Sequence, residues 1–77
     1  NGFYKFNDTR LEDILTTLSL WYDVDVIYAD ESVKELRFTS SGKIIRYDSL
    51  TSLLKKFEYT NNVKFDLNGK NLIVRQK

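Results

Sequence analysis

The apolar and polar positions of this chain follow the same order twice, with a constant offset of 39 residues between the two copies. Each copy begins with apolar residues three and four positions apart, which is the spacing of one helix face. Each copy then alternates between apolar and polar residues, as a half-buried β-strand does. The chain is therefore predicted to contain two helix–strand units. The matching positions are Leu11/Leu50, Ile14/Leu53, Leu15/Leu54, Leu18/Phe57, Val24/Val63 and Val26/Phe65.

The two helices are predicted from these stripes and from the residues that precede them. The first should run from Thr9 to about Tyr22, because Thr9 is a suitable N-cap and Glu12 completes a capping box. Asp48 is the predicted cap of the second helix, whose stripe ends at Phe57. Two lysines, Lys55 and Lys56, are expected near its C-terminus, where cations suit the helix dipole.

Five short strands are predicted before, between and after the two helices. The Asn68-Gly69 pair predicts a type I′ turn between the last two strands, because both central positions of that turn need positive φ. Residues 29–35 are polar and should form a connection, with room for one helical turn. The resulting order is a β-α-β-β-α-β-β pseudo-repeat of the α+β class. The predicted strands cover residues 3–6, 24–28, 36–40, 63–67 and 70–75.

The predicted core contains the inward positions of these elements. A chain of this size buries only about 60–65% of the surface that its unfolded form exposes, so the core is thin. Its expected members are Phe6, Leu11, Ile14, Leu15, Leu18, Tyr22, Val24, Val26, Phe38, Leu50, Leu53, Leu54, Phe57, Val63, Phe65, Leu72 and Val74.

The composition indicates one domain, residues 1–77, and limits its chemistry. The 77 residues include no cysteine and no histidine. Methionine is also absent, and position 1 is Asn. Disulfides, thiolate zinc sites and the commonest general base are therefore excluded. We expect the chain to be a fragment of a larger protein. It contains no apolar run long enough to span a membrane and no signal-peptide pattern.

Charge is distributed unevenly along the chain. Residues 1–39 carry four Lys or Arg against eight Asp or Glu, whereas residues 40–77 carry eight against three. The net charges are therefore −4 and +5, which together give the overall +1. This pattern favours two solvated faces of opposite sign, and such an asymmetry can also steer a partner.

Catalytic and ligand-binding chemistry has little support in the sequence. Asp23 and Asp25 share a strand face, and Asp30 precedes Glu31. One acidic pair is a poor calcium site, because Ca²⁺ takes about six to eight oxygen ligands, so a solvated strand face is favoured. Residues 40–43 (Ser-Ser-Gly-Lys) lack the spacing of a phosphate-binding loop. The chain also lacks the aromatic and basic sheet signature of RNA-binding modules. We expect no catalytic residue, cofactor, metal or nucleic acid.

Protein binding is better supported, by apolar residues that lie off the helical stripe. Leu20 is about 180° from Leu11 on the helical wheel, and Trp21 lies about 80° to one side. Either the helix is covered on both sides or Leu20 contacts another protein, while Trp21 is expected to pack at the core edge. The candidate partner-binding residues are Leu20, Tyr4 and Tyr47, together with an exposed strand edge.

Residues 6–15 (Phe-Asn-Asp-Thr-Arg-Leu-Glu-Asp-Ile-Leu) and 18–26 (Leu-Ser-Leu-Trp-Tyr-Asp-Val-Asp-Val) carry a family resemblance. They resemble the C-terminal domain of FecR-like anti-sigma factors of the Bacteroidetes type, although Arg10 stands where proline is usual. The resemblance extends through the Asn68-Gly69 hairpin to the last strand. The same architecture is similar to the secretin and TonB short N-terminal domain.

The resemblance implies two helices sandwiched between two small β-sheets, in the periplasmic domain of a single-pass inner-membrane protein. It also implies binding to the N-terminal signalling domain of a TonB-dependent outer-membrane receptor, which regulates an extracytoplasmic-function sigma factor. The alternative is the short N-terminal signalling domain of a TonB-dependent transducer or a secretin. An enzyme is disfavoured, and the oligomeric state stays open.

Overall fold

The computed structural model describes residues 3–40, 42, 44–45 and 49–77 of the chain. Helix α1 covers Leu11–Tyr22 and α2 covers Leu50–Thr60, so both predicted helices are confirmed. The connection after the first unit contains the short 3-10 helix η1, Glu31–Glu35, where a single turn was expected.

The strands of the described residues form three sheets. Antiparallel pairs join β1 to β5 and β2 to β4, while β3, β7 and β6 form one three-stranded sheet. In that sheet β7 is central, parallel to β3 and antiparallel to β6. The strand bounds are β1 Phe3–Tyr4, β2 Thr9–Arg10, β3 Asp25–Tyr28, β4 Arg37–Phe38, β5 Ile44–Ile45, β6 Val63–Asn68 and β7 Asn71–Gln76.

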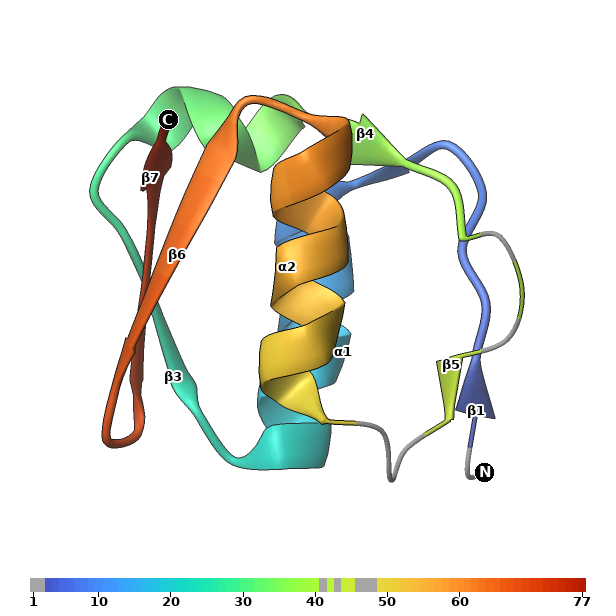
Figure 1. The fold of residues 1–77 in the computed structure, drawn as a ribbon, viewed down its shortest axis with the longest axis horizontal. Helices are drawn as coiled ribbons and strands as arrows, with labels where there is room; N and C mark the ends of the chain where they lie inside the picture. The colour runs from blue at the N-terminus through green and yellow to red at the C-terminus, as the bar shows by residue number, and fades with distance from the viewer. Residues whose placement is uncertain (1–2, 41, 43, 46–48) are drawn as a thin grey trace.

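These elements form three layers (Figure 1). The three-stranded sheet lies on one side, the two helices run in opposite directions through the middle, and the two small ladders lie on the other side. This arrangement confirms the predicted α+β class with helices between two β layers. The second layer consists of two separate ladders because its strands are only two residues long.

The core lies between the layers and agrees with the predicted set at 14 of its positions, all of which are buried. Tyr22, Val24 and Val26 are only partly buried against it. Tyr22 lies at the end of α1, Val24 just before β3 and Val26 on edge strand β3, so each lies at the margin of the core. Val33 is 2% exposed and was missed, because a lone apolar residue in a polar connection gives no periodic signal.

The predicted capping box at the start of α1 is wrong. The N-cap residue is Arg10, without a side-chain cap, and Thr9 belongs to β2. The Leu11 amide instead donates to Leu36 O (2.7 Å). Because the carbonyl between η1 and β4 satisfies this amide, the helix begins directly from β2 and Glu12 is left to pair with Arg10 (2.8 Å).

The start of α2 also differs from its prediction. Ser49 is the N-cap, with its Oγ accepting from the Ser52 amide (3.4 Å), whereas Asp48 lies outside the described residues. The helix continues to Thr60 and carries no basic residue in its last turn, so Lys55 and Lys56 are not at the helix end.

The hairpin between β6 and β7 is confirmed, but its turn is not the predicted one. Asn68 pairs with Asn71, so Gly69 and Lys70 are the two central residues. Only Gly69 has positive φ (+59°). A glycine with positive φ at the first central position is the requirement of a type II′ turn.

Candidate protein-interaction surface

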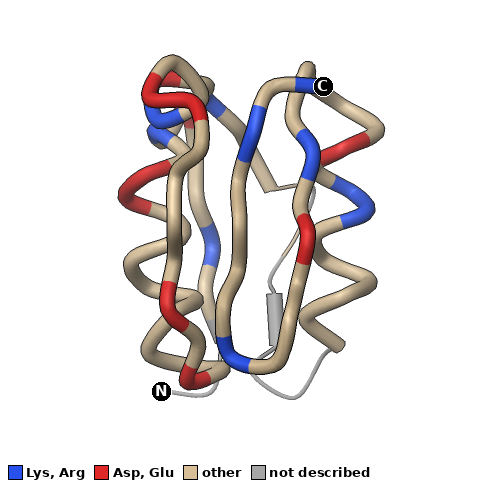
Figure 2. The backbone as a smooth tube through the Cα atoms, turned by 90° about the vertical axis from the view of Figure 1, so that its left-hand side faces the viewer, with Lys and Arg blue, Asp and Glu red and all other residues tan. Residues whose placement is uncertain are grey.

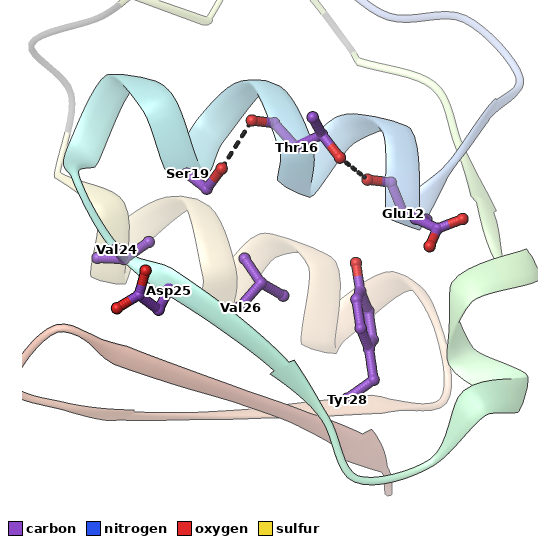
Figure 3. Close-up of a pocket in the computed structure, with 7 residues that line it drawn as sticks. All are labelled: Glu12, Thr16, Ser19, Val24, Asp25, Val26 and Tyr28. Atoms are coloured by element: carbon purple, nitrogen blue, oxygen red, sulfur yellow. Dashed lines mark hydrogen bonds between the residues drawn. The ribbon is translucent and has the colours of Figure 1, made fainter.

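A groove runs between the outer flank of α1 and the free edge of β3 (Figure 3). We call it the β3 groove. Its volume is about 340 Å³. Three polar residues of α1 form one wall, because positions i, i+4 and i+7 share a helix face. Polar α1 side chains therefore face the edge of a strand across an open channel. The lining residues are Glu12, Thr16, Ser19, Val24, Asp25, Val26 and Tyr28.

The backbone of β3 presents unpaired groups to this groove. Asp25 N–H donates to Lys70 O (2.7 Å) and Ala29 N–H donates to Val74 O (2.8 Å). Alternate residues of a strand direct their N–H and C=O groups to opposite sides. Val26 and Tyr28 therefore direct theirs away from β7, and no other described residue bonds to their amides.

A second groove lies between α2 and β6 at the opposite edge of the sheet. We call it the β6 groove. Its volume is about 420 Å³. With the offset of 39 residues, its lining matches that of the β3 groove almost position for position, so the sequence repeat produces two related grooves. The lining residues are Thr51, Leu54, Lys55, Glu58, Lys64, Phe65, Asp66 and Leu67.

The two grooves differ at the strand edge. Glu58 Oε2 accepts a hydrogen bond from the Phe65 amide (2.8 Å), which is one of the outward-facing amides of β6. The repeat equivalent of Glu58 is Ser19, whose hydroxyl donates to Thr16 O (2.7 Å) in its own helix. The Phe65 amide at the β6 edge is therefore covered by a side chain of the domain, whereas the equivalent Val26 amide on β3 is not.

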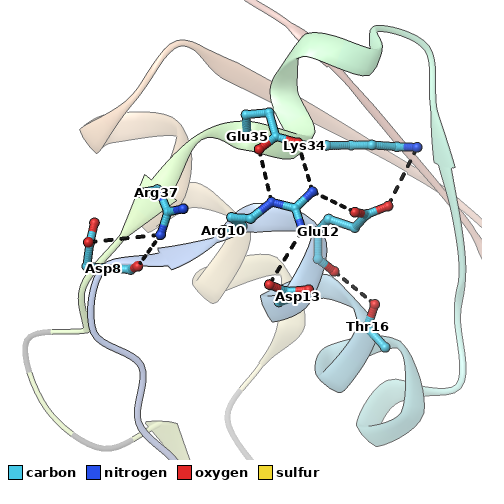
Figure 4. Close-up of polar contacts among 8 residues, drawn as sticks. All are labelled: Asp8, Arg10, Glu12, Asp13, Thr16, Lys34, Glu35 and Arg37. Carbon is cyan, nitrogen blue, oxygen red and sulfur yellow. Dashed lines mark hydrogen bonds and ion pairs between the residues drawn. The ribbon is translucent and has the colours of Figure 1, made fainter.

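A charged network closes one end of the β3 groove (Figure 4). Arg10 binds Glu35 through Nε (3.0 Å) and a terminal nitrogen (2.8 Å), and it also binds Glu12 (2.8 Å). Lys34 reaches Glu12 (3.6 Å) and Glu31 (2.7 Å). The bidentate Arg10 lowers the pKa of Glu35, and Glu31 raises the pKa of Lys34. The network ties the start of α1 to η1.

Tyr28 stands between this network and the groove. Its ring lies 5.0 Å from Lys34 Nζ, measured to the ring centroid. Burial, and after it the negative charge of Glu12, raises the pKa of Tyr28 to about 12. The phenol of Tyr28 therefore stays protonated, and can donate a hydrogen bond into the groove, throughout the physiological pH range.

This pKa predicts an alkaline dependence of stability. An unfolded tyrosine loses its proton near pH 10, earlier than the folded Tyr28, so the contribution is complete below about pH 10 and is lost as pH rises toward about 12. Urea denaturation of wild type and Tyr28→Phe at about pH 9 and about pH 11 measures it. We expect the wild type to lose more stability between the two pH values than the variant. Equal losses would contradict the raised pKa.

The candidate binding residues differ in how far the structure exposes them. Leu20 is 78% exposed, so α1 is not covered on both sides at this position. Tyr4 is half-buried. Its ring packs on those of Phe6 (5.5 Å between centroids) and Trp21 (6.0 Å between centroids). Trp21 packs at the core edge, as expected. Tyr47 lies outside the described residues. The role of Leu20, Tyr4 and Tyr47 in partner binding remains a prediction.

The acidic pairs of the sequence do not gather into a site. Asp23 pairs with Lys70 (2.8 Å), while Asp25 lies exposed at the β3 groove. Across the residues that the structure describes, no cluster of three or more acidic side chains could hold a metal ion. The helices found in the same part of the chain are too short and too polar to cross a membrane.

A protein-family comparison identifies the chain. The family described as FecR, C-terminal matches residues 3–74. This chain is a FecR C-terminal domain. The match covers both repeat units and both grooves, so the whole three-layer fold belongs to the family unit. No curated protein matches the sequence.

The FecR C-terminal domain shares its fold with part of a larger solved structure. That structure is a candidate anti-sigma factor from Parabacteroides distasonis ATCC 8503, with a TM-score of 0.81 and 16% sequence identity. The likeness covers 99% of this chain and 34% of the other chain. This chain thus spans about a third of the protein that it resembles.

The FecR C-terminal domain also keeps the charge asymmetry of its sequence in three dimensions (Figure 2). Acidic residues follow α1 and β3, where Asp25 and Glu12 line the β3 groove. Basic residues follow β6, β7 and α2, where Lys55 and Lys64 line the β6 groove. The repeat-related grooves therefore carry opposite charges at the equivalent positions Asp25 and Lys64.

Proposed function

We propose that this FecR C-terminal domain receives a signal on behalf of a membrane-anchored anti-sigma factor. Its partner in the proposal is the N-terminal signalling domain of a TonB-dependent outer-membrane receptor, which it meets in the periplasm. Docking changes the state of the anti-sigma factor and thereby regulates an extracytoplasmic-function sigma factor. The observation that carries the proposal is the family match over residues 3–74.

The surface chemistry supports a protein partner. Small molecules usually bind in concave, mostly apolar pockets that enclose them. The two grooves of this domain are instead open channels beside strand edges, where hydroxyl and charged side chains alternate with apolar ones. Such surfaces suit a folded or extended protein segment, which brings its own polar backbone. A binding module is accordingly a better description of the domain than an enzyme.

The proposal is tested by binding and by signalling. Isothermal titration of this chain with the signalling domain of the receptor encoded beside its parent gene should show a one-to-one complex. Deleting residues 1–77 from the parent protein should abolish the response of a sigma-dependent reporter to the receptor's inducer. Absence of binding together with an unchanged response would overturn the proposal.

Leu20 gives a residue-level prediction for this complex. The side chain is 78% exposed, so Leu20→Asp should leave the fold intact and place a charge in any interface that covers it. We expect affinity for the receptor domain to fall more than about tenfold, which corresponds to about 1.4 kcal/mol. Tyr47→Ala tests the second predicted residue in the same titration.

The matched control is Tyr59→Ala, which removes another highly exposed side chain (88%) from α2. We expect it to leave the affinity unchanged. If Leu20→Asp and Tyr47→Ala both change the affinity by less than about threefold, the partner binds elsewhere on the domain.

A further inference from the structure

The two edge strands of the three-stranded sheet are related by the sequence repeat. They differ in whether a side chain of the domain accepts a hydrogen bond from the outward amide. On β6, the outward amide of Phe65 is occupied by Glu58, seven residues earlier in the chain (2.8 Å). On β3, the residue seven positions before Val26 is Ser19, which bonds to its own helix instead. An uncovered strand edge is a template for another strand. The domain therefore covers the middle outward amide of β6 and leaves the equivalent amide of β3 uncovered.

We propose that the β3 edge binds an extended segment of the partner protein, which adds as a fourth strand to the β3-β7-β6 sheet. The inference rests on the proposed function, that the domain binds a protein, and specifies where and how. The partner's backbone would pair with the outward N–H and C=O groups of Val26 and Tyr28. The strand from Asp25 to Tyr28 spans about 10 Å at about 3.3 Å per residue, which suits a partner segment of about four residues.

The side chains around this edge define the chemistry of the segment. Side chains of an added strand would alternate between the groove and the solvent face of the sheet. On the solvent face they would lie beside Asp25 and Ile27, which is 46% exposed. Asp25 makes no ion pair with any described residue. A Lys or Arg of the partner would form an ion pair with its carboxylate. In the groove they would meet Glu12 and Thr16 on the α1 wall.

A second copy of this chain fits the β3 edge less well. Pairing β3 with β3 of a copy would bring two strands carrying Asp25 together, and like charges on paired strands are destabilising. Pairing β3 with β6 of a copy would require Glu58 to leave the Phe65 amide. The observations therefore favour a different protein whose segment is basic.

The test introduces on β3 the carboxylate that covers the outward amide of β6. Ser19→Glu places a carboxylate at the repeat position of Glu58, where it can accept from the Val26 amide. Val26→Pro removes the same amide, and proline is tolerated on an edge strand whose N–H points outward. Ser19→Ala is the matched control for the helix position, and Glu58→Ser uncovers the other edge.

Isothermal titration with the receptor signalling domain provides the readout, with circular dichroism to confirm that each variant is folded. We expect Ser19→Glu and Val26→Pro each to weaken binding at least about tenfold, and Ser19→Ala and Glu58→Ser to change it less than about threefold. Hydrogen exchange of the Val26 amide in the wild-type chain should slow on complex formation. This last measurement needs no variant and holds even if Val26→Pro fails to fold.

The outcomes separate the two proposals. Binding by the wild type that is unaffected by Ser19→Glu, with unchanged exchange at Val26, would overturn the β3 edge and leave the proposed function standing. Absence of binding by the wild type would overturn the proposed function and the inference with it. Sedimentation of the wild type and Ser19→Glu completes the test. Self-association of the wild type that Ser19→Glu abolishes would assign the edge to a second copy instead.

Discussion

Replacing Phe57 with alanine is expected to remove a large part of the free energy of unfolding of this domain. The ring of Phe57 on α2 contacts Phe38 of the ladder layer (4.9 Å between centroids), Phe6 (5.9 Å) and Phe65 of the sheet (6.2 Å). Truncating a buried phenylalanine costs about 3–5 kcal/mol. A domain of this length is stable by only about 4–12 kcal/mol.

The measurement is thermal unfolding by circular dichroism. At about 4–8 °C per kcal/mol for a domain of this size, Phe57→Ala should lower Tm by more than about 12 °C. Phe57→Leu is the matched control, because it keeps an apolar side chain at the junction and should cost less than half as much. A Tm for Phe57→Ala within about 3 °C of the wild type would show that the layers do not depend on this ring.

The core and the order of elements could be predicted because they depend on periodicity. The stripe of α1 places Leu11, Ile14, Leu15 and Leu18 on one face whatever surrounds it, and all four are buried. Strand alternation likewise identified the inward face of β6. The buried face of a regular element is encoded in its local sequence. It can therefore be predicted without knowing which elements pack against it.

The helix caps could not be predicted in the same way, because they depend on contacts that are distant in sequence. Thr9 and Glu12 have the spacing of a capping box, but the Leu11 amide already has Leu36 O as its partner. Glu12 instead joins a network with Arg10 and Lys34, which come together only when η1 folds back onto α1. Tertiary pairing thus outweighs a correct local pattern.

The candidate surface was predicted only in part. The sequence indicated an exposed strand edge and an off-stripe Leu20, but not which edge is open. The repeat held the missing signal: Glu58 and Ser19 occupy equivalent positions 39 residues apart, with a long acceptor in one copy and a short hydroxyl in the other. This difference can be interpreted only when the Phe65 amide is known to face away from β7. The order and pairing of the strands give that direction.

Leu15→Ala is the second substitution with a large expected effect, and α1 provides its own control. Leu15 is fully buried (0% exposed) in the stripe that faces the core, whereas Leu20 is 78% exposed on the opposite side of the same helix. Both changes remove the same atoms and both raise helix propensity slightly. The difference between them therefore measures burial alone.

We expect Leu15→Ala to lower the free energy of unfolding by about 2–5 kcal/mol, because it removes buried methyl groups and leaves a cavity. Leu20→Ala should change it by less than about 0.5 kcal/mol, as surface substitutions usually do. Urea denaturation of the three proteins gives both values. Equal effects would mean that α1 is covered on both sides in solution, which would also remove Leu20 from the candidate interface.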